Sequence, residues 1–208
     1  MDTNHFDEKA ATWDDDPAKI ERAEVVAHAI RAAVALNGTT RMLEYGAGTG
    51  LVTQALRDSV GPVTLADTST GMREVMRAKI AAGALPDAEL WDVDLATQPA
   101  PDDRFDLIVT VLTLHHIDDI DAVLAAFATL LSENGTLCVV DLDKEDGSFH
   151  GEGFHGHSGF ERAALADQLA VAGFSDVMFH DCHHIVHDGV EYPIFLAICR
   201  PGRVDVTP

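Results

Sequence analysis

The residues of this chain best suited to chemistry surround a short glycine-rich segment. Gly46-Ala47-Gly48-Thr49-Gly50 follows an apolar run, and Glu44 lies two positions before the first glycine. Glycines let a ligand approach the backbone closely because they carry no side chain. Leu51 stands where the G-x-G-x-x-G fingerprint of dinucleotide-binding proteins needs its third glycine, so a pyrophosphate ligand is disfavoured. The carboxylate of Glu44 instead favours a ligand that carries an amino group.

A second carboxylate follows the next apolar run. Asp67 comes directly after the segment 63–66, where its two oxygens could accept hydrogen bonds from both hydroxyls of a ribose. The alternative is that Asp67 caps a helix, but Ser69 or Thr70 could fill that role. An amino group beside Glu44 and a ribose at Asp67 together outline S-adenosylmethionine.

Adjacent histidines form another candidate site. His115 and His116 follow the apolar run 105–110. Imidazole can act as a general base near neutral pH, so we consider His115 as a catalytic residue and His116 as a substrate contact. The alternative is that the two side chains only orient the start of the next helix.

More histidines lie between two later elements. Glu152 is surrounded by His150, His155 and His157, and imidazole with carboxylate could hold a divalent ion. The segment has no closely spaced helical pair of ligands and is rich in glycine. We therefore expect no metal, and we predict that His150 and His155 line a substrate pocket.

The elements that must position these groups alternate between strand and helix. A first helix is predicted from Pro17, after an N-cap at Asp16, to a stop at Asn37-Gly38. The predicted strands cover 41–45, 63–66, 89–93, 105–110 and 136–140, and the predicted helices cover 51–56, 72–80, 120–131 and, from a capping box, 158–172. Strands near 177–179 and 192–199 then follow one another without a helix, as in an antiparallel pair.

This alternation predicts an α/β fold, with a parallel sheet covered by helices on both faces. In such sheets ligands bind beyond the carboxyl ends of the strands. The glycine-rich segment, Asp67, the region of Asp92 and Asp94, and His115 all follow predicted strands. The candidate site residues should therefore converge at one edge of the sheet.

Composition limits the partners. The 208 residues include 35 acidic and 14 basic side chains, a net charge of −21, and 47% are hydrophobic. Such a chain folds rather than staying disordered, but it repels nucleic acids and anionic membranes. We find no apolar run of the roughly 18 residues that a membrane span needs and no signal peptide. The three cysteines suggest neither disulfides nor zinc. A cytoplasmic protein with a small-molecule partner is predicted, and a homodimer is left open.

The ordered motifs resemble those of class I S-adenosylmethionine-dependent methyltransferases. The resemblance extends over roughly 40–200, in the segments 43–50, 65–72, 105–117, 130–137 and 153–174. It is strongest to small bacterial metabolite methyltransferases of the ubiquinone-biosynthesis type. The resemblance implies a Rossmann-like seven-stranded sheet of order 3-2-1-4-5-7-6 with strand 7 antiparallel, within a single domain over 1–208.

The resemblance also implies a set of cofactor-binding residues. They are Glu44, Tyr45, Gly46, Ala47, Gly48, Gly50, Asp67, Thr68, Met72, Asp92, Asp94, Leu95, Val111 and Leu112. The glycine-rich backbone would line the methionine portion, Asp67 the ribose, and Thr68 with Met72 the adenine. Either Asp92 or Asp94 would meet the adenine amino group, and the spacing to Phe105 favours Asp94.

The N-terminal part, 1–37, is predicted to be a lid segment followed by a helix. Phe6 and Trp13 are aromatic residues in an otherwise polar stretch. They could staple this stretch to the domain, or close over the bound molecules and exclude water. We favour the lid and count Trp13 among the substrate contacts.

The predicted function is transfer of a methyl group from S-adenosylmethionine to a small molecule, at oxygen or carbon. The sequence lacks an Asn-Pro-Pro-Tyr-like motif of nucleic-acid amino methylation, in agreement with the acidic charge. Two alternatives remain: a non-catalytic S-adenosylmethionine-binding protein and, with less support, a nicotinamide-dependent oxidoreductase.

Overall fold

A computed structural model describes residues 3–151 and 153–202. One seven-stranded sheet has the order β3-β2-β1-β4-β5-β7-β6. The strands are β1 Met42–Tyr45, β2 Val63–Ala66, β3 Glu89–Trp91, β4 Phe105–Val111, β5 Leu131–Leu142, β6 Phe174–His187 and β7 Val190–Pro201. Strand β7 is antiparallel to both β5 and β6, and the other pairs are parallel. The predicted fold class and strand order are confirmed.

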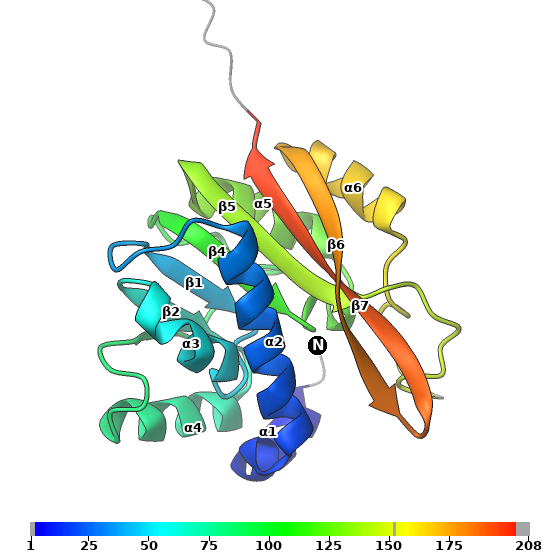
Figure 1. Cartoon of the computed structure of the whole chain (residues 1–208), viewed down its shortest axis with the longest axis horizontal. Coiled ribbons are helices and arrows are strands. Elements are labelled where there is room, and N and C mark those ends of the chain that lie inside the picture. The colour runs from blue at the N-terminus through cyan, green and yellow to red at the C-terminus, as the bar shows by residue number, and fades with distance from the viewer. Residues whose placement is uncertain (1–2, 152, 203–208) are drawn as a thin grey trace, which may run out of the picture.

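Helices cover both faces of this sheet (Figure 1). The helices are α1 Thr3–Lys9, α2 Pro17–Ala33, α3 Leu51–Leu56, α4 Thr70–Ala81, α5 Ile120–Leu130 and α6 Arg162–Val171, with short 3-10 turns η1 Ala10–Asp15, η2 Arg57–Ser59 and η3 Leu114–His116. Helices α2, α3 and α4 contribute to one hydrophobic core and α5 and α6 to the other. The layers are therefore helix, sheet, helix.

Alternation along the strands supplies both cores. In β5, Leu137 and Val139 belong to the core under α5 and α6, whereas Cys138 and Val140 belong to the core under α2 and α3. Successive side chains of a strand point to opposite faces, so a continuous apolar run is what a strand buried on both faces requires.

Some predicted boundaries differ from the structure, among them the end of α2 and the start of α6. Helix α2 begins as predicted, because the Asp16 carboxylate accepts from Ala18 N at 3.0 Å, but it ends at Ala33. Val34 is already extended, and Asn37 starts the turn before β1 by accepting from Thr39 N. The predicted capping box at 158–161 does not form, since Glu161 is the N-cap of α6.

The terminal hairpin is much longer than predicted, and its tip projects beyond the other strands (Figure 1). Many of its side chains are exposed, so the apolar pattern is weak. Its two-residue turn, Asp188-Gly189, has positive φ at both residues, 50° and 79°. An Asp-Gly pair is a hairpin signal that the sequence does contain.

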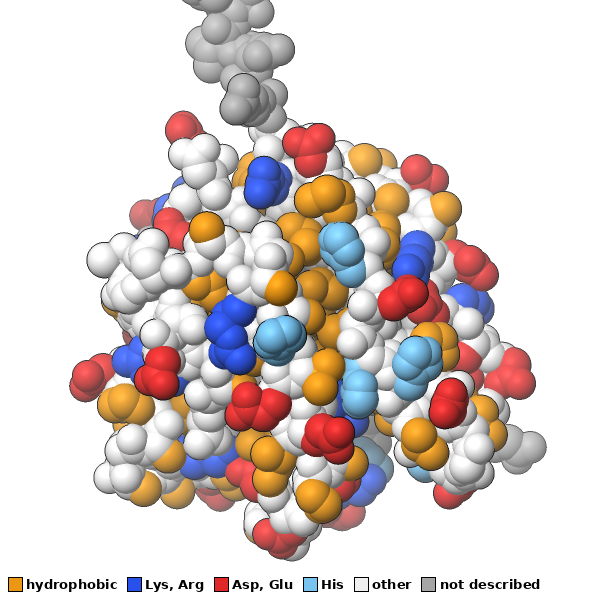
Figure 2. Space-filling view, viewed as in Figure 1, with side chains coloured by type: hydrophobic (Ala, Val, Ile, Leu, Met, Phe, Trp, Pro, Cys, Tyr) orange, Lys and Arg blue, Asp and Glu red, His pale blue; other side chains and the backbone are white. Residues whose placement is uncertain are grey.

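Charged side chains of both signs are mixed on the surface. On the face drawn in Figure 2, the Lys and Arg side chains of the described residues stand singly, without a continuous basic stripe. Among the described residues, every helix is too short or too polar to cross a membrane.

Replacing Phe127 by Ala tests the core that supports β1. Phe127 is fully buried on α5, and its ring meets the edge of Tyr45 at 5.4 Å between centroids. The change should lower the free energy of unfolding by about 3–5 kcal/mol, measured by chemical denaturation. Val171→Ala is the control: Val171 is 89% exposed, so its effect should stay within about 0.5 kcal/mol. Equal effects would contradict this view of the core.

Candidate functional site

The loops that follow the carboxyl ends of β1, β2, β3 and β4 surround one cavity. It is lined by Tyr45, Gly46, Asp67, Thr68, Asp94, Ala96, Thr97, Thr113, Ile117, Asp118 and Asp119. Five of these residues were predicted to bind a cofactor: Tyr45, Gly46, Asp67, Thr68 and Asp94. The structure thus brings the first, second and third predicted strand ends together, as expected for a parallel sheet.

Gly46 makes the turn after β1 possible. It has φ of 70°, and its own N and that of Ala47 donate to Ala66 O at 2.8 and 3.0 Å. A Cβ at Gly46 would lie 2.2 Å from the Thr113 side chain. Only glycine allows the loop after β1 and the loop after β4 to touch here.

Glu44 supports the glycine-rich loop from behind. Its Oε2 accepts from Thr53 N at 3.0 Å and from the Thr53 hydroxyl, so it ties β1 to the first turn of α3. It is buried and does not line the cavity. Burial raises the pKa of Glu44 from its usual 4.5 to about 7, although the bonds from Thr53 oppose this shift.

Asp67 holds the same loop from the cavity side. Its Oδ2 accepts from Gly48 N at 2.7 Å and its Oδ1 from Ser69 N at 2.8 Å. Burial raises its pKa, and these two backbone bonds oppose the rise. Ser69 caps α4 by accepting from Met72 N at 3.1 Å. The residue that caps α4 is therefore Ser69 and not Asp67.

The two candidate acids after β3 are separated clearly. Asp94 lines the cavity, and its Oδ1 accepts from Ala96 N. Asp92 instead pairs with Arg73 at 2.9 Å, and its side chain is 71% exposed. Next to Asp94, the buried Leu95 donates its N–H to the Tyr45 hydroxyl at 3.1 Å, which fixes this loop to β1.

Some predicted contacts lie outside the cavity lining. Met72 is 1% exposed, and Val111 and Leu112 pack on the core beneath α2 and α3. Leu112 has φ of 52°, which is uncommon for a side chain other than glycine, and its N–H donates to Val140 O. This residue turns the chain from β4 toward η3.

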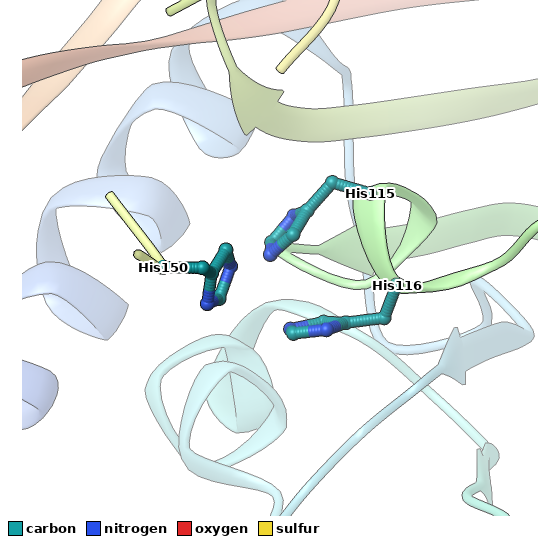
Figure 3. Close-up of side chains that lie close together, drawn as sticks. All are labelled: His115, His116 and His150. Carbon is teal, nitrogen blue, oxygen red and sulfur yellow. The ribbon is translucent and has the colours of Figure 1, made fainter. Parts of the chain in front are cut away.

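Three histidines meet beside the cavity (Figure 3). His115 and His116 come from η3 and His150 from the loop after β5, and one nitrogen of each lies within 4.8 Å of the others. His115 Nδ1 is 2.6 Å from Asp141 Oδ1, whereas its Nε2, in the described part of the chain, has no partner. Burial lowers the pKa of His116 to about 2 and of His150 to about 4, and the neighbouring imidazole of His115 adds to both shifts.

Aromatic rings enclose this histidine cluster. Phe6 meets His116 edge-on at 5.1 Å, Phe154 stacks on His150 at 3.9 Å, and Phe149 meets His150 at 4.8 Å between centroids. Gly156 closes the loop against η3, since a Cβ there would lie 2.1 Å from His115 O.

Other predicted substrate residues lie apart from the cluster. His155 is exposed, and His157 Nε2 binds Ile117 O at 2.9 Å. Trp13 packs on Phe6 and under Lys19 Nζ, which is 4.0 Å from the ring centre. Glu152 lies outside the described residues.

The N-terminal segment lies over the same edge of the sheet. Asp7 accepts from Gly71 N at 2.8 Å and from the Ser69 hydroxyl. Asp14 accepts from the Thr49 hydroxyl at 2.6 Å and pairs with Lys79 at 2.6 Å. These two acids were not predicted, because a polar segment gives no indication of its partners. Asp141 was not predicted either, although it lies next to the end of the buried strand β5.

Comparison with known proteins identifies the class. The family model of a methyltransferase domain matches residues 18–185. The chain belongs to this methyltransferase family, and its sheet order is that of class I, which uses S-adenosylmethionine as methyl donor. The family assignment does not support the nicotinamide-dependent oxidoreductase that the sequence left as an alternative.

Individual relatives agree with this class. The chain is 35% identical over 130 residues to the biotin biosynthesis bifunctional protein BioCD of Bordetella avium. The aligned region covers 62% of this chain and 27% of BioCD. It is 30% identical over 108 residues to the ubiquinone/menaquinone biosynthesis C-methyltransferase UbiE of Shewanella halifaxensis, covering 50% of this chain and 43% of the relative. The matches thus span less than half of these two relatives.

A solved structure shows the same fold over nearly the whole chain. The complex of DhpI with SAH aligns with a TM-score of 0.72 at 22% identity, covering 96% of this chain and 95% of DhpI.

Glu44→Gln tests the burial of this carboxyl. A carboxyl whose pKa is raised on folding keeps its proton in the folded state while the unfolded chain loses it. As pH rises from 4.5 to 7, the wild-type protein should therefore lose stability relative to the variant, which lacks this carboxyl. By urea unfolding, the variant should gain about 3 kcal/mol over wild type between pH 4 and pH 8.

The control is Glu24→Gln, at an exposed position of α2. Its difference from wild type should be the same at both pH values. A pH-independent difference for Glu44→Gln would mean that Glu44 is not desolvated.

Proposed function

We propose that this chain transfers the methyl group of S-adenosylmethionine to a small organic acceptor, at oxygen or at carbon. One observation carries the proposal: the turn η3 separates two different environments. Thr113 and Ile117, on either side of η3, line the cavity at the strand ends, which four aspartates also line. His115 and His116, between them, contact the aromatic and histidine cluster. A cofactor on one side would thus meet an acceptor on the other.

The cofactor would occupy the cavity at the strand ends. Its methionine part would follow the backbone at Gly46 and its ribose would bind Asp67, which lies beside Thr68. Its adenine amino group would donate to Asp94. In support, four aspartates line the cavity, Asp67, Asp94, Asp118 and Asp119. Such a set suits hydroxyl and amino donors and repels phosphate.

The acceptor would bind among the rings. His116 and His150 are neutral near pH 7, as their lowered pKa values imply, and the neighbouring Phe6 and Phe154 are apolar. A neutral aromatic surface favours a flat acceptor that is uncharged or weakly acidic, such as a phenol or an enol. These groups can be methylated at oxygen or at carbon. The net charge of −21 argues against a nucleic acid.

His115 is the residue that we propose as catalytic. In the tautomer that we propose, His115 donates its Nδ1–H to Asp141, and the lone pair on Nε2 faces the other rings of the cluster. In transfer, that lone pair takes the acceptor proton, the acceptor attacks the methyl carbon, and the C–S bond breaks. S-adenosylhomocysteine leaves with the electron pair. Most of the rate enhancement would come from holding the two reactants about 3–3.5 Å apart.

The N-terminal segment would act as a lid on this reaction. Its Phe6 contacts His116, and its Asp7 and Asp14 bind the loops that follow β2 and β1. Such a cover excludes water from the methyl group. The cytoplasmic location, the single domain and the homodimer stay predictions.

Asp94→Ala tests where the cofactor binds. Loss of a hydrogen bond to a charged group should weaken the binding of S-adenosylhomocysteine about 10- to 100-fold, measured by calorimetric titration. Asp92→Ala is the matched control and should change the affinity less than about twofold, because Asp92 faces Arg73. NAD should not bind. The reverse order of the two variants would place the adenine elsewhere.

Methyl transfer itself is tested with labelled S-adenosylmethionine and a mixture of phenols and enols, with RNA and protein as competing acceptors. Label should enter a small molecule. His115→Gln should lower kcat by about 10²- to 10⁴-fold and leave the affinity for S-adenosylhomocysteine unchanged. Label only in RNA or protein would contradict the acceptor class. Cofactor binding without any transfer would favour the non-catalytic alternative.

A further inference from the structure

The histidine cluster has a feature that methyl transfer does not require. Transfer needs one imidazole lone pair, whereas the cluster brings together three rings, with centroids 4.1 to 5.1 Å apart. Ordinary aromatic packing explains the stacking of His150 on Phe154. Within this packing, a nitrogen of each of the three histidines lies within 4.8 Å of the other two, so that one ion could be shared among them.

His115 supplies a second, independent observation. Its ring is almost fully buried, with 2% of the side chain exposed, and in the described part of the chain Nε2 has no hydrogen-bond partner. An unpaired buried polar atom costs about 1–3 kcal/mol, so such an atom calls for a ligand. Figure 3 shows the rings of His115, His116 and His150 directed toward one another.

We propose that His115, His116 and His150 bind one divalent transition-metal ion of the zinc type and leave a fourth coordination position open toward the acceptor pocket. Three protein ligands with an open position are typical of zinc ions that act on a substrate. This site departs from the expectation of no metal. It uses a different set of residues from the one weighed in the sequence, and it shares only His150 with that set.

The surroundings of His115 fit such a ligand. Its Nδ1 lies 2.6 Å from Asp141 Oδ1, and Asp141 is fixed in turn by the N–H of Leu142 at 2.8 Å. Histidines that bind metal almost always donate their other N–H to a carboxylate or carbonyl, which fixes the ring and makes it more basic. Asp141 would therefore serve as a positioning residue.

Ion binding requires a modest closure of the cluster. Metal–nitrogen bonds of about 2.0–2.1 Å place neighbouring ligand nitrogens roughly 3.3 Å apart in a tetrahedral site. The largest separation here is up to 4.8 Å. His150 is exposed on a loop that contains Gly147, Gly151 and Gly153, all with positive φ, so its ring can move without disturbing the sheet.

The chemistry of the ligands selects the kind of ion. Imidazole suits zinc, copper, iron and nickel, whereas magnesium and calcium prefer oxygen ligands. One lone pair cannot hold both a proton and an ion. A bound ion would therefore displace the base at His115, and its charge would favour an ionised oxygen of the acceptor instead. Ion binding is for this reason measured separately from methyl transfer.

The test is a titration of tag-free, chelator-treated protein with Co²⁺, followed by visible absorption. One equivalent of Co²⁺ should give a saturable band, Zn²⁺ should displace it, and Mg²⁺ should not. His150→Phe and His116→Phe keep the ring size and remove the nitrogens. Loss of a residue that only supports a metal ligand lowers metal affinity about 10- to 100-fold. Each of these two variants removes a ligand and should weaken Co²⁺ binding by more than that.

His155→Phe is the matched control, because His155 lies on the same loop, is exposed and is not in the cluster. It should bind Co²⁺ like wild type. Absence of a saturable band in wild type, or equal binding by wild type and His150→Phe, would overturn the proposal. Thermal unfolding confirms that each variant is folded, and a titration with S-adenosylhomocysteine in the same samples shows whether the cofactor site is intact.

Discussion

The site depends on carboxylates removed from water at the carboxyl edge of the sheet. Burial removes much of the water around Glu44 and Asp67. Glu44 accepts a hydrogen bond from the N–H of Thr53, and Asp67 accepts hydrogen bonds from the N–H groups of Gly48 and Ser69. Their bonds fix the glycine-rich turn before any ligand arrives. The arrangement costs stability, as the raised pKa of Glu44 shows. A preformed binding loop is the compensating gain, because less ordering remains to be done on binding.

The turn η3 is the second constraint. It is fixed by Thr113 against Gly46 on one side and by the backbone of Gly156 and His157 on the other. A rigid turn between a cofactor cavity and an acceptor pocket is what an in-line transfer requires, since a misplacement of about 1 Å can cost 100-fold in rate. The same rigidity would preorganise two of the three proposed metal ligands, leaving only His150 to adjust.

The sequence was sufficient to predict the site residues that directly follow a single strand. Alternating elements predicted a parallel α/β sheet, and the resemblance to class I methyltransferases implied its strand order. The resemblance also called for an acid after β3, and the spacing to Phe105 favoured Asp94, which lines the cavity. The sequence was not sufficient to predict contacts between residues that are far apart in the chain. His115 and His150 are separated by α5 and β5, so their approach depends on how the loop after β5 folds back. The predicted start of α6 at Ser158 was wrong. Phe160 forms a β-bridge with Asp143, so the chain is still extended there and the helix begins only at Arg162.

The contacts of the N-terminal segment have a consequence for product release. Asp7 binds the start of α4, and Asp14 is paired with Lys79, with 31% and 14% of the two side chains exposed. These contacts are partly accessible to solvent ions, whereas the bond from Thr53 to Glu44, which supports the glycine-rich loop, is buried. Added salt weakens exposed pairs much more than buried ones. Under the proposed function, ionic strength would therefore govern how fast the spent cofactor leaves, while the binding surface itself keeps its shape.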